Sequence, residues 1–109
     1  HALETALGDQ SLLRELAAIC LQESSDLLEQ IDQAIATDNH AELRRASHTL
    51  KSQMRMFGAS EPERLARCIE NTATAGSVEF AEPLSQLLQE IEQVHHELRD
   101  LLDGKIAFG

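Results

Sequence analysis

The chain has 109 residues, enough for one domain with a single hydrophobic core. Nineteen Asp and Glu against nine Lys and Arg give a formal net charge of −10, which argues against nucleic acid or an anionic membrane as partner, because both attract basic surfaces. The apolar residues are mainly Leu, Ile and Ala, a mixture that favours helices over sheets, and no apolar run is long enough to span a bilayer.

The first third of the chain predicts one long helix. Residues 2–7 are expected to form a short lead-in helix that Gly8 ends, with Asp9 as the N-cap of the next helix. Apolar or small residues then recur at spacings of three and four, which predicts an amphipathic helix over about 10–36. Its stripe comprises Leu13, Leu16, Ala17, Cys20, Ser24, Leu27, Leu28, Ile31, Ala34 and Ile35. Further apolar residues broaden this stripe, and we expect them to contact the lead-in helix or to remain as an open docking surface: Leu12, Ile19 and Leu21.

A second helix is predicted from about 40 to 57. Asn39 followed by Glu42 resembles a capping box, and Gly58 is placed to end the helix in a left-handed cap. At 100° per residue, His48 lies roughly opposite the apolar arc of this helix and should face water. That arc consists of Leu43, Ala46, Leu50, Met54 and Phe57.

Two further helices are predicted after Gly58. Ser60 and Glu63 form a second predicted capping box, with Pro62 in the first turn, and Gly76 should end this third helix. Its expected buried residues are Leu65, Cys68, Ile69 and Thr72. The fourth helix begins near 82 if Pro83 marks its start, or earlier if Ser77 caps it, since Val78 and Phe80 also resemble core residues. Its apolar repeat is Leu84, Leu87, Ile91, Val94, Leu98 and Leu101.

Four amphipathic helices joined by short turns predict an all-α fold, an antiparallel up-down four-helix bundle with a short N-terminal lead-in helix. We expect one domain over residues 1–109, with a bundle core of about 10–103 and a tail over 104–109. Cys20 and Cys68 both lie at apolar-periodic positions, so they are expected to be reduced, small core residues rather than a disulfide.

His48 is the candidate reactive residue. A lone surface histidine usually has no role, but six of the nine Lys and Arg fall between positions 44 and 67. Residues three and four apart are neighbours on a helix, and nearby cations keep an imidazole neutral and nucleophilic while attracting an incoming anion. Phosphoryl acceptance on His48 is the chemistry that fits. The side chains expected to frame the phosphate or its donor are Arg44, Arg45, Lys51, Ser52, Arg55 and, on the flank, Met56.

Other chemistries have weaker support. No Gly-rich phosphate loop is present, so the chain is expected not to bind ATP and not to be an enzyme in its own right. A metal site would require His40, His48, His95 and His96 to converge, yet His95 and His96 lie about 100° apart on one helix. We therefore expect no metal ligand and no cofactor in this chain.

The residues around His48 resemble the signature of the histidine-containing phosphotransfer (HPt) domain. That signature is a histidine, any residue, an apolar residue, lysine, glycine, two small residues, two variable ones, an apolar residue and Gly-Ala. The matching residues are His48, Leu50, Lys51, Phe57, Gly58 and Ala59. The departures are Ser52 in place of the usual glycine, and Gln53 and Met54 in place of small residues.

The resemblance implies a module of a two-component phosphorelay. His48 would accept a phosphoryl group from a receiver-domain aspartate and pass it to another receiver, and the receivers would supply the magnesium ion. The partners implied are response-regulator receiver domains, with no nucleic acid and no direct membrane contact. The module is expected in the cytoplasm, as part of a longer hybrid sensor histidine kinase that can itself be membrane-bound.

Two alternatives stay open at this point. The departures at positions 52 to 54 allow a bundle that docks a receiver without being phosphorylated. A purely structural or dimerising bundle would bury the broad apolar stripe of residues 12–28 against a copy of itself.

Overall fold

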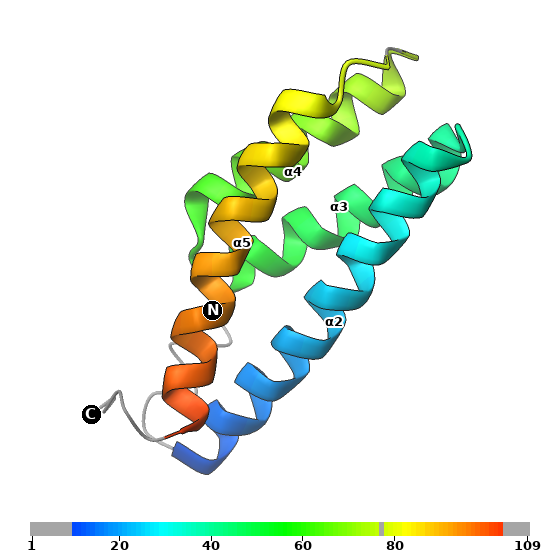
Figure 1. The fold of residues 1–109 in the computed structure, drawn as a ribbon. Helices are drawn as coiled ribbons and strands as arrows, with labels where there is room; N and C mark the ends of the chain where they lie inside the picture. Colours follow the sequence, from blue (N-terminus) through cyan, green and yellow to red (C-terminus); the bar gives the residue numbers. More distant parts are fainter. Residues whose placement is uncertain (1–9, 77, 104–109) are drawn as a thin grey trace.

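Four α-helices make up the computed structural model, which describes residues 10–76 and 78–103. They are α2 (Gln10–Ala36), α3 (His40–Met56), α4 (Ser60–Thr74) and α5 (Ala81–Leu102). Successive helices run in opposite directions (Figure 1). Each helix packs against two others: α2 and α4 both contact α3 on one side and α5 on the other. The described part has no strand, and none of its helices has the length and hydropathy needed to cross a bilayer. The prediction of an all-α four-helix fold is confirmed, whereas the predicted lead-in helix and tail lie outside the described residues.

The turn between α2 and α3 is set by side-chain capping. Asn39 is the N-cap of α3, and its side-chain oxygen accepts a hydrogen bond from the Glu42 amide at 3.1 Å. This bond satisfies one of the N–H groups that a helix start leaves unpaired. The reciprocal half of the predicted box is absent, because the Glu42 carboxylate binds Arg45 instead.

Gly58 ends α3 as predicted. Its φ of +71° is left-handed, a conformation that glycine adopts without steric cost. The Gly58 amide donates to the Arg55 carbonyl at 3.0 Å, and the Ala59 amide donates to the Met54 carbonyl at 2.9 Å. This pair of bonds is the Schellman arrangement, which reverses the chain tightly enough for α4 to return along α3.

The predicted capping box at the start of α4 is wrong. The N-cap is Ala59, which offers no side-chain hydrogen bond, and Ser60 is already the first helical residue. Glu63 does not reach back to the helix start, because its carboxylate accepts hydrogen bonds from Arg55 and Arg67 instead. One cation from α3 and one from the next turn of α4 thus outweigh a single backbone amide.

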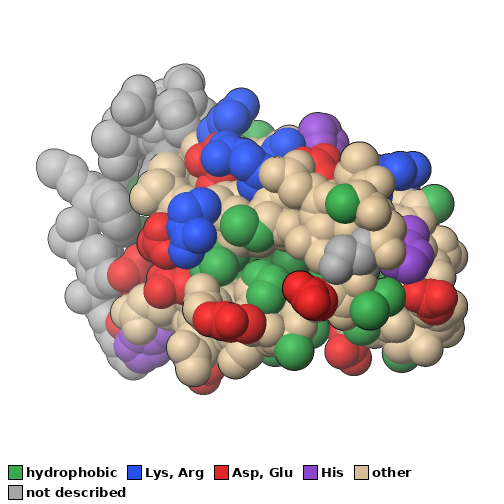
Figure 2. Space-filling model, turned by 90° about the horizontal axis from the view of Figure 1, so that it is seen from above, with side chains coloured by type: hydrophobic (Ala, Val, Ile, Leu, Met, Phe, Trp, Pro, Cys, Tyr) green, Lys and Arg blue, Asp and Glu red, His purple; other side chains and the backbone are tan. Residues whose placement is uncertain are grey.

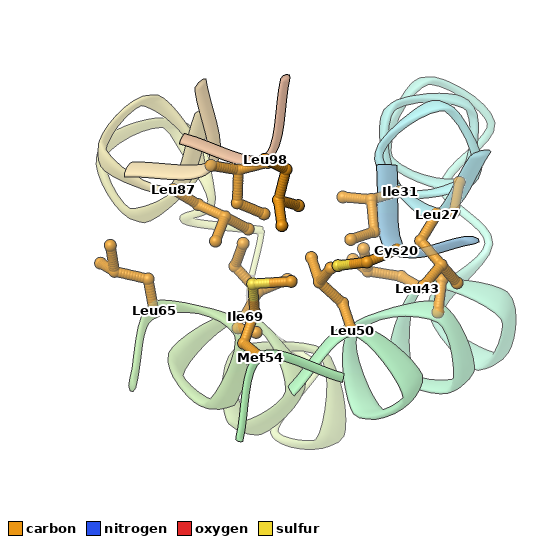
Figure 3. Close-up of a cluster of buried hydrophobic side chains, with 14 of the residues drawn as sticks. Cys20, Leu27, Ile31, Leu43, Leu50, Met54, Leu65, Ile69, Leu87 and Leu98 are labelled. Atoms are coloured by element: carbon orange, nitrogen blue, oxygen red, sulfur yellow. The ribbon is translucent and has the colours of Figure 1, made fainter. Parts of the chain in front are cut away.

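The core lies between all four helices, and side chains from each of them meet in Figure 3. All but one residue of the predicted α3 arc are buried, and Phe57 is half-buried at its end. On α4, Leu65 and Ile69 are buried as predicted, but Cys68 and Thr72 are only half-buried. Ala66 and Ala73 take the inner positions, since the face that meets α3 and α5 is rotated from the one expected.

The prediction for residues 78–80 was half right. Phe80 is buried and precedes the first residue of α5, whereas Val78 is 70% exposed in the connection before it. The start of α5 at Ala81 agrees with the start that Pro83 indicated.

One polar contact crosses the core between α2 and α5. The Ser24 hydroxyl lies 2.6 Å from the Cys20 carbonyl and 2.6 Å from Nε2 of His95, and both side chains are buried. Because a hydroxyl has one hydrogen, Ser24 donates to the carbonyl and accepts from Nε2–H of His95. Burial, and then the charge of Arg99, lower the pKa of His95, which favours the neutral ring, in its Nε2–H tautomer, as the donor of this bond.

Candidate functional site

His48 projects from the outer face of α3. The neighbouring residues Ala46, Ser47 and Leu50 are fully buried, so the inner side of the helix is fixed against the core. The helical rotation then directs His48 outward, where its side chain is 60% exposed. Position and exposure therefore agree with the spacing argument.

The carboxylate of Glu70, on α4, contacts His48 directly. Its Oε2 lies 2.6 Å from Nδ1 of His48, and its Oε1 accepts a hydrogen bond from Nζ of Lys51 at 2.7 Å. Glu70 and Lys51 are both largely covered, with 16% and 18% of their side chains exposed. An exposed imidazole is thus attached to a partly buried ion pair that joins α3 to α4.

The protonation state of Glu70 fixes the tautomer of His48. Burial alone would raise the pKa of Glu70, but the hydrogen bonds from Lys51 and His48 and their charges outweigh it and lower that pKa below its usual value. An ionised carboxylate can only accept hydrogen bonds, so Nδ1 of His48 must carry a hydrogen. In the neutral ring the lone pair then resides on Nε2, at the far end of an exposed side chain.

The predicted cationic frame around His48 is only partly present. Lys51 reaches the site, but through Glu70, and Arg44 is exposed with no ion pair to any described residue. Arg45 binds Glu42 and Gln30, while Arg55 binds Glu63. The face in Figure 2 accordingly shows Lys and Arg side chains interspersed with acidic ones. The cations neutralise carboxylates of their own chain, which sequence spacing did not reveal.

Ser52 and Met56 lie on the same side of α3, one and two turns after His48. The Ser52 hydroxyl donates to the His48 carbonyl at 3.2 Å, so its hydrogen is used within the helix. Met56 is 44% exposed. The predicted roles of both side chains concern an incoming partner.

A groove of about 370 Å³ runs beside His48, between the first half of α2 and the second half of α3. Its apolar lining includes Ile19, which is 51% exposed, and Met56. Leu12 is 40% exposed on α2 and is not among the lining residues. The groove residues are Leu16, Ile19, Cys20 and Glu23 from α2, and Thr49, Ser52, Gln53, Met56 and Phe57 from α3.

The other histidines among the described residues, His40, His95 and His96, do not join His48. His95 is buried against Ser24, His96 is exposed beside Asp100, and His40 begins α3 with its ring centroid 6.3 Å from that of Phe80. Within residues 10–76 and 78–103, no three His, Cys, Asp or Glu side chains are grouped so that they could hold a metal ion.

Sequence reasoning missed Glu70. The signal was available in principle, because Gly58 predicts an antiparallel α3–α4 pair and Glu70 follows Gly58 by about as many residues as His48 precedes it. The spacing of residues within α3 alone does not give this register between the two helices.

Comparison with protein families gives one match. A family model described as "Hpt domain" matches residues 15–104. This range includes most of α2 and all of α3, α4 and α5. No curated protein and no solved structure matches the chain.

Proposed function

Since this chain belongs to the Hpt domain family, whose members carry phosphoryl groups in two-component phosphorelays, we propose that His48 is its phosphoacceptor. Such domains are phosphocarriers rather than ATP-binding catalysts, and they interact with receiver domains. The observation that carries the assignment is the Nδ1 contact with Glu70, which leaves the Nε2 lone pair on an exposed ring.

The transfer step follows from that tautomer. Nε2 of His48 attacks the phosphorus of an aspartyl phosphate on the receiver, and the bond from phosphorus to the carboxylate oxygen breaks. The electron pair of that bond leaves with the aspartate, and the phosphoryl group is now bonded to Nε2. Nδ1 keeps its hydrogen throughout, and the reverse sequence delivers the group to another receiver. Any magnesium ion is bound by the receiver and supplies charge neutralisation for the phosphoryl oxygens.

Glu70 and Lys51 have separate parts in this proposal. The ring becomes cationic as the bond to phosphorus forms, and the Glu70 carboxylate stabilises that charge through Nδ1–H. Lys51 balances the carboxylate, so that Glu70 does not repel the phosphoryl oxygens as a bare anion would. Both residues also hold the ring in a single orientation, which shortens the search for an attack geometry.

The receiver is proposed to dock over His48 and the adjoining groove. Ile19 and Met56 offer exposed apolar surface there, and Arg44 offers a charge that no described residue neutralises. Because Arg45 and Arg55 bind Glu42 and Glu63, they contribute to docking only by exchanging those partners. The groove lies beside the imidazole, so contacts in it would orient the receiver without covering Nε2.

The proposed setting is a cytoplasmic module of a hybrid sensor histidine kinase. The family membership supports a relay role, and the acidic charge of −10 favours protein partners over nucleic acid.

Labelled phosphate from a receiver domain tests the assignment. A receiver charged with acetyl [³²P]phosphate is mixed with wild type, with His48→Gln, and with His96→Gln as a matched control, since His96 is similarly exposed. Acid-labile label is expected on wild type and on His96→Gln, and none on His48→Gln. Retained receiver binding without label on wild type would favour the docking module that is not phosphorylated.

A further inference from the structure

Gln53 is a buried amide at the edge of the groove beside His48. It is 9% exposed, and its Nε2 donates to Oε2 of Glu23, across the groove on α2, at 3.0 Å. Its Oε1 is buried, with no hydrogen-bond partner among the residues that the structure describes. Glu23 itself is exposed.

The Glu23 carboxylate determines which way this amide faces. A carboxylate accepts hydrogen bonds, so the NH₂ end of Gln53 must point to it and the oxygen must point away. The unpaired oxygen has lost its water without gaining a donor, a state that costs free energy in the isolated domain. That cost is relieved when the amide swings into the groove, so that its oxygen meets a donor while its NH₂ group stays near the Glu23 carboxylate.

We propose that Gln53, oriented by Glu23, is a specificity-determining residue that selects receivers carrying a Lys or Arg side chain within an otherwise apolar contact surface. The proposal rests on the proposed function, because it assigns a preference to the partner that docks beside His48. Ile19 and Met56 meet the apolar surface, while Glu23 and Gln53 provide acceptors for the cation between them.

The preference follows from what docking does to the groove. A receiver that covers the groove removes water from the exposed Glu23 carboxylate, whereas Oε1 of Gln53 is without water already in the free domain. A cationic donor replaces that water, since an ammonium group can donate to Oε2 of Glu23 and to Oε1 of Gln53 once the amide has turned outward. A purely aliphatic surface leaves these acceptors unpaired, and sites built to hydrogen-bond a group discriminate strongly against partners that lack it.

Transfer rates across a set of receivers test this inference. Receiver domains from the genome that encodes this chain are each charged with acetyl [³²P]phosphate, and kcat and KM for transfer are measured. The variants are Gln53→Met, which keeps the length of the side chain and removes both polar groups, and Glu23→Gln, an exposed change that does not disturb the core. Gln93→Met is the matched control, because Gln93 is an exposed residue of α5 that does not line the groove.

The expected result is a selective loss. For the fastest receiver, Gln53→Met and Glu23→Gln raise KM by about tenfold and leave kcat within about twofold, as for the loss of one hydrogen bond to a charged group. Slower receivers and the Gln93→Met control change by less than about twofold. Replacing the contact-surface Lys or Arg of the fastest receiver by Met removes the effect of Gln53→Met.

Two outcomes separate the inference from the function on which it rests. Label on wild type with unchanged ratios between receivers in both variants overturns the role of Gln53 alone. No label on wild type from any receiver overturns the proposed function, and the inference with it.

Discussion

Replacing Glu70 by Gln tests the link between geometry and transfer most directly. The change removes the negative charge and keeps the side-chain shape, so the amide oxygen can still accept from Nδ1 of His48. The charge-assisted bond to His48 becomes a neutral one, and Lys51 loses its acceptor, because the NH₂ group of the amide now faces Nζ. We expect Glu70→Gln to slow phosphorylation of His48 and leave the fold intact.

The magnitude follows from the nature of the bond that is weakened. A hydrogen bond to a charged group contributes about 1.5–3 kcal/mol, and Glu70 is only 16% exposed, so solvent screens it little. Only the part that strengthens as the ring becomes cationic affects the rate. Because each 1.4 kcal/mol is about tenfold, transfer is expected to fall about tenfold in Glu70→Gln and about a hundredfold in Glu70→Ala.

Single-turnover transfer from a charged receiver measures this effect, with Glu63→Gln as control. Glu63 lies on the same helix and is also 16% exposed, but it binds Arg55 and Arg67 instead of His48. A rate in Glu70→Gln equal to that of Glu63→Gln would refute the reasoning, because it would show that the carboxylate at Nδ1 does not assist the reaction.

The lowered pKa of Glu70 also predicts how the free energy of unfolding depends on pH in acid. Its pKa is lower in the folded chain than the ordinary value, so its ionised form stabilises the fold above the unfolded pKa of about 4.3. That contribution is lost as the pH falls through the folded pKa. The difference in unfolding free energy between wild type and Glu70→Gln should therefore shrink on acidification from pH 7 to pH 3, as measured by urea titration, and a constant difference would contradict the lowered pKa.

Three further predictions concern the scaffold. Burial, and then the charge of Glu23, raise the pKa of Cys20 to about 12, so about one thiol in ten thousand is ionised at pH 8; thiol reagents should label Cys20 only on unfolding, and rapid labelling of the native chain there would contradict its burial. Ser24→Ala leaves Nε2 of His95 without its partner and should lower the free energy of unfolding by about 1–3 kcal/mol, as measured by urea titration at pH 7. Because this cost comes from the unpaired nitrogen, adding His95→Phe to Ser24→Ala should not lower the stability further. Gly58→Ala should lower stability by about 1–2 kcal/mol although the added methyl meets no atom within 4 Å outside the adjacent residues, since the cost arises from the left-handed backbone; an unchanged melting temperature would argue against that conformation in solution.

Local signals in the sequence predicted local structure well. Asn39 and Gly58 delimit α3 because capping needs only atoms within four residues of the helix end, and both bonds are present. The same reasoning failed for Ser60 and Glu63. The capping prediction considered only a nearby backbone amide as the partner of Glu63. In the fold, the Glu63 carboxylate accepts hydrogen bonds from Arg55 of the preceding helix and from Arg67. The prediction that Val78 is a core residue was wrong for a similar reason. An apolar side chain in a short connection is buried only if a neighbouring element covers it.

The missing piece at the site was a relation between helices, which periodicity within a single helix cannot supply. Rotation placed His48 outward and the cations near it, but it gave no information on which carboxylates the next helix would bring. The tight turn at Gly58 sets an antiparallel register in which Arg55 meets Glu63 and, farther from the turn, His48 meets Glu70. The acidic partners in that ladder come from α4, so Lys51 and Arg55, which sequence spacing placed around the imidazole, instead join α3 to α4, while Arg45 binds Glu42 of its own helix. What remains at His48 is an oriented ring whose Nδ1 donates to a carboxylate 22 positions away in sequence, and the proposed transfer depends on that contact.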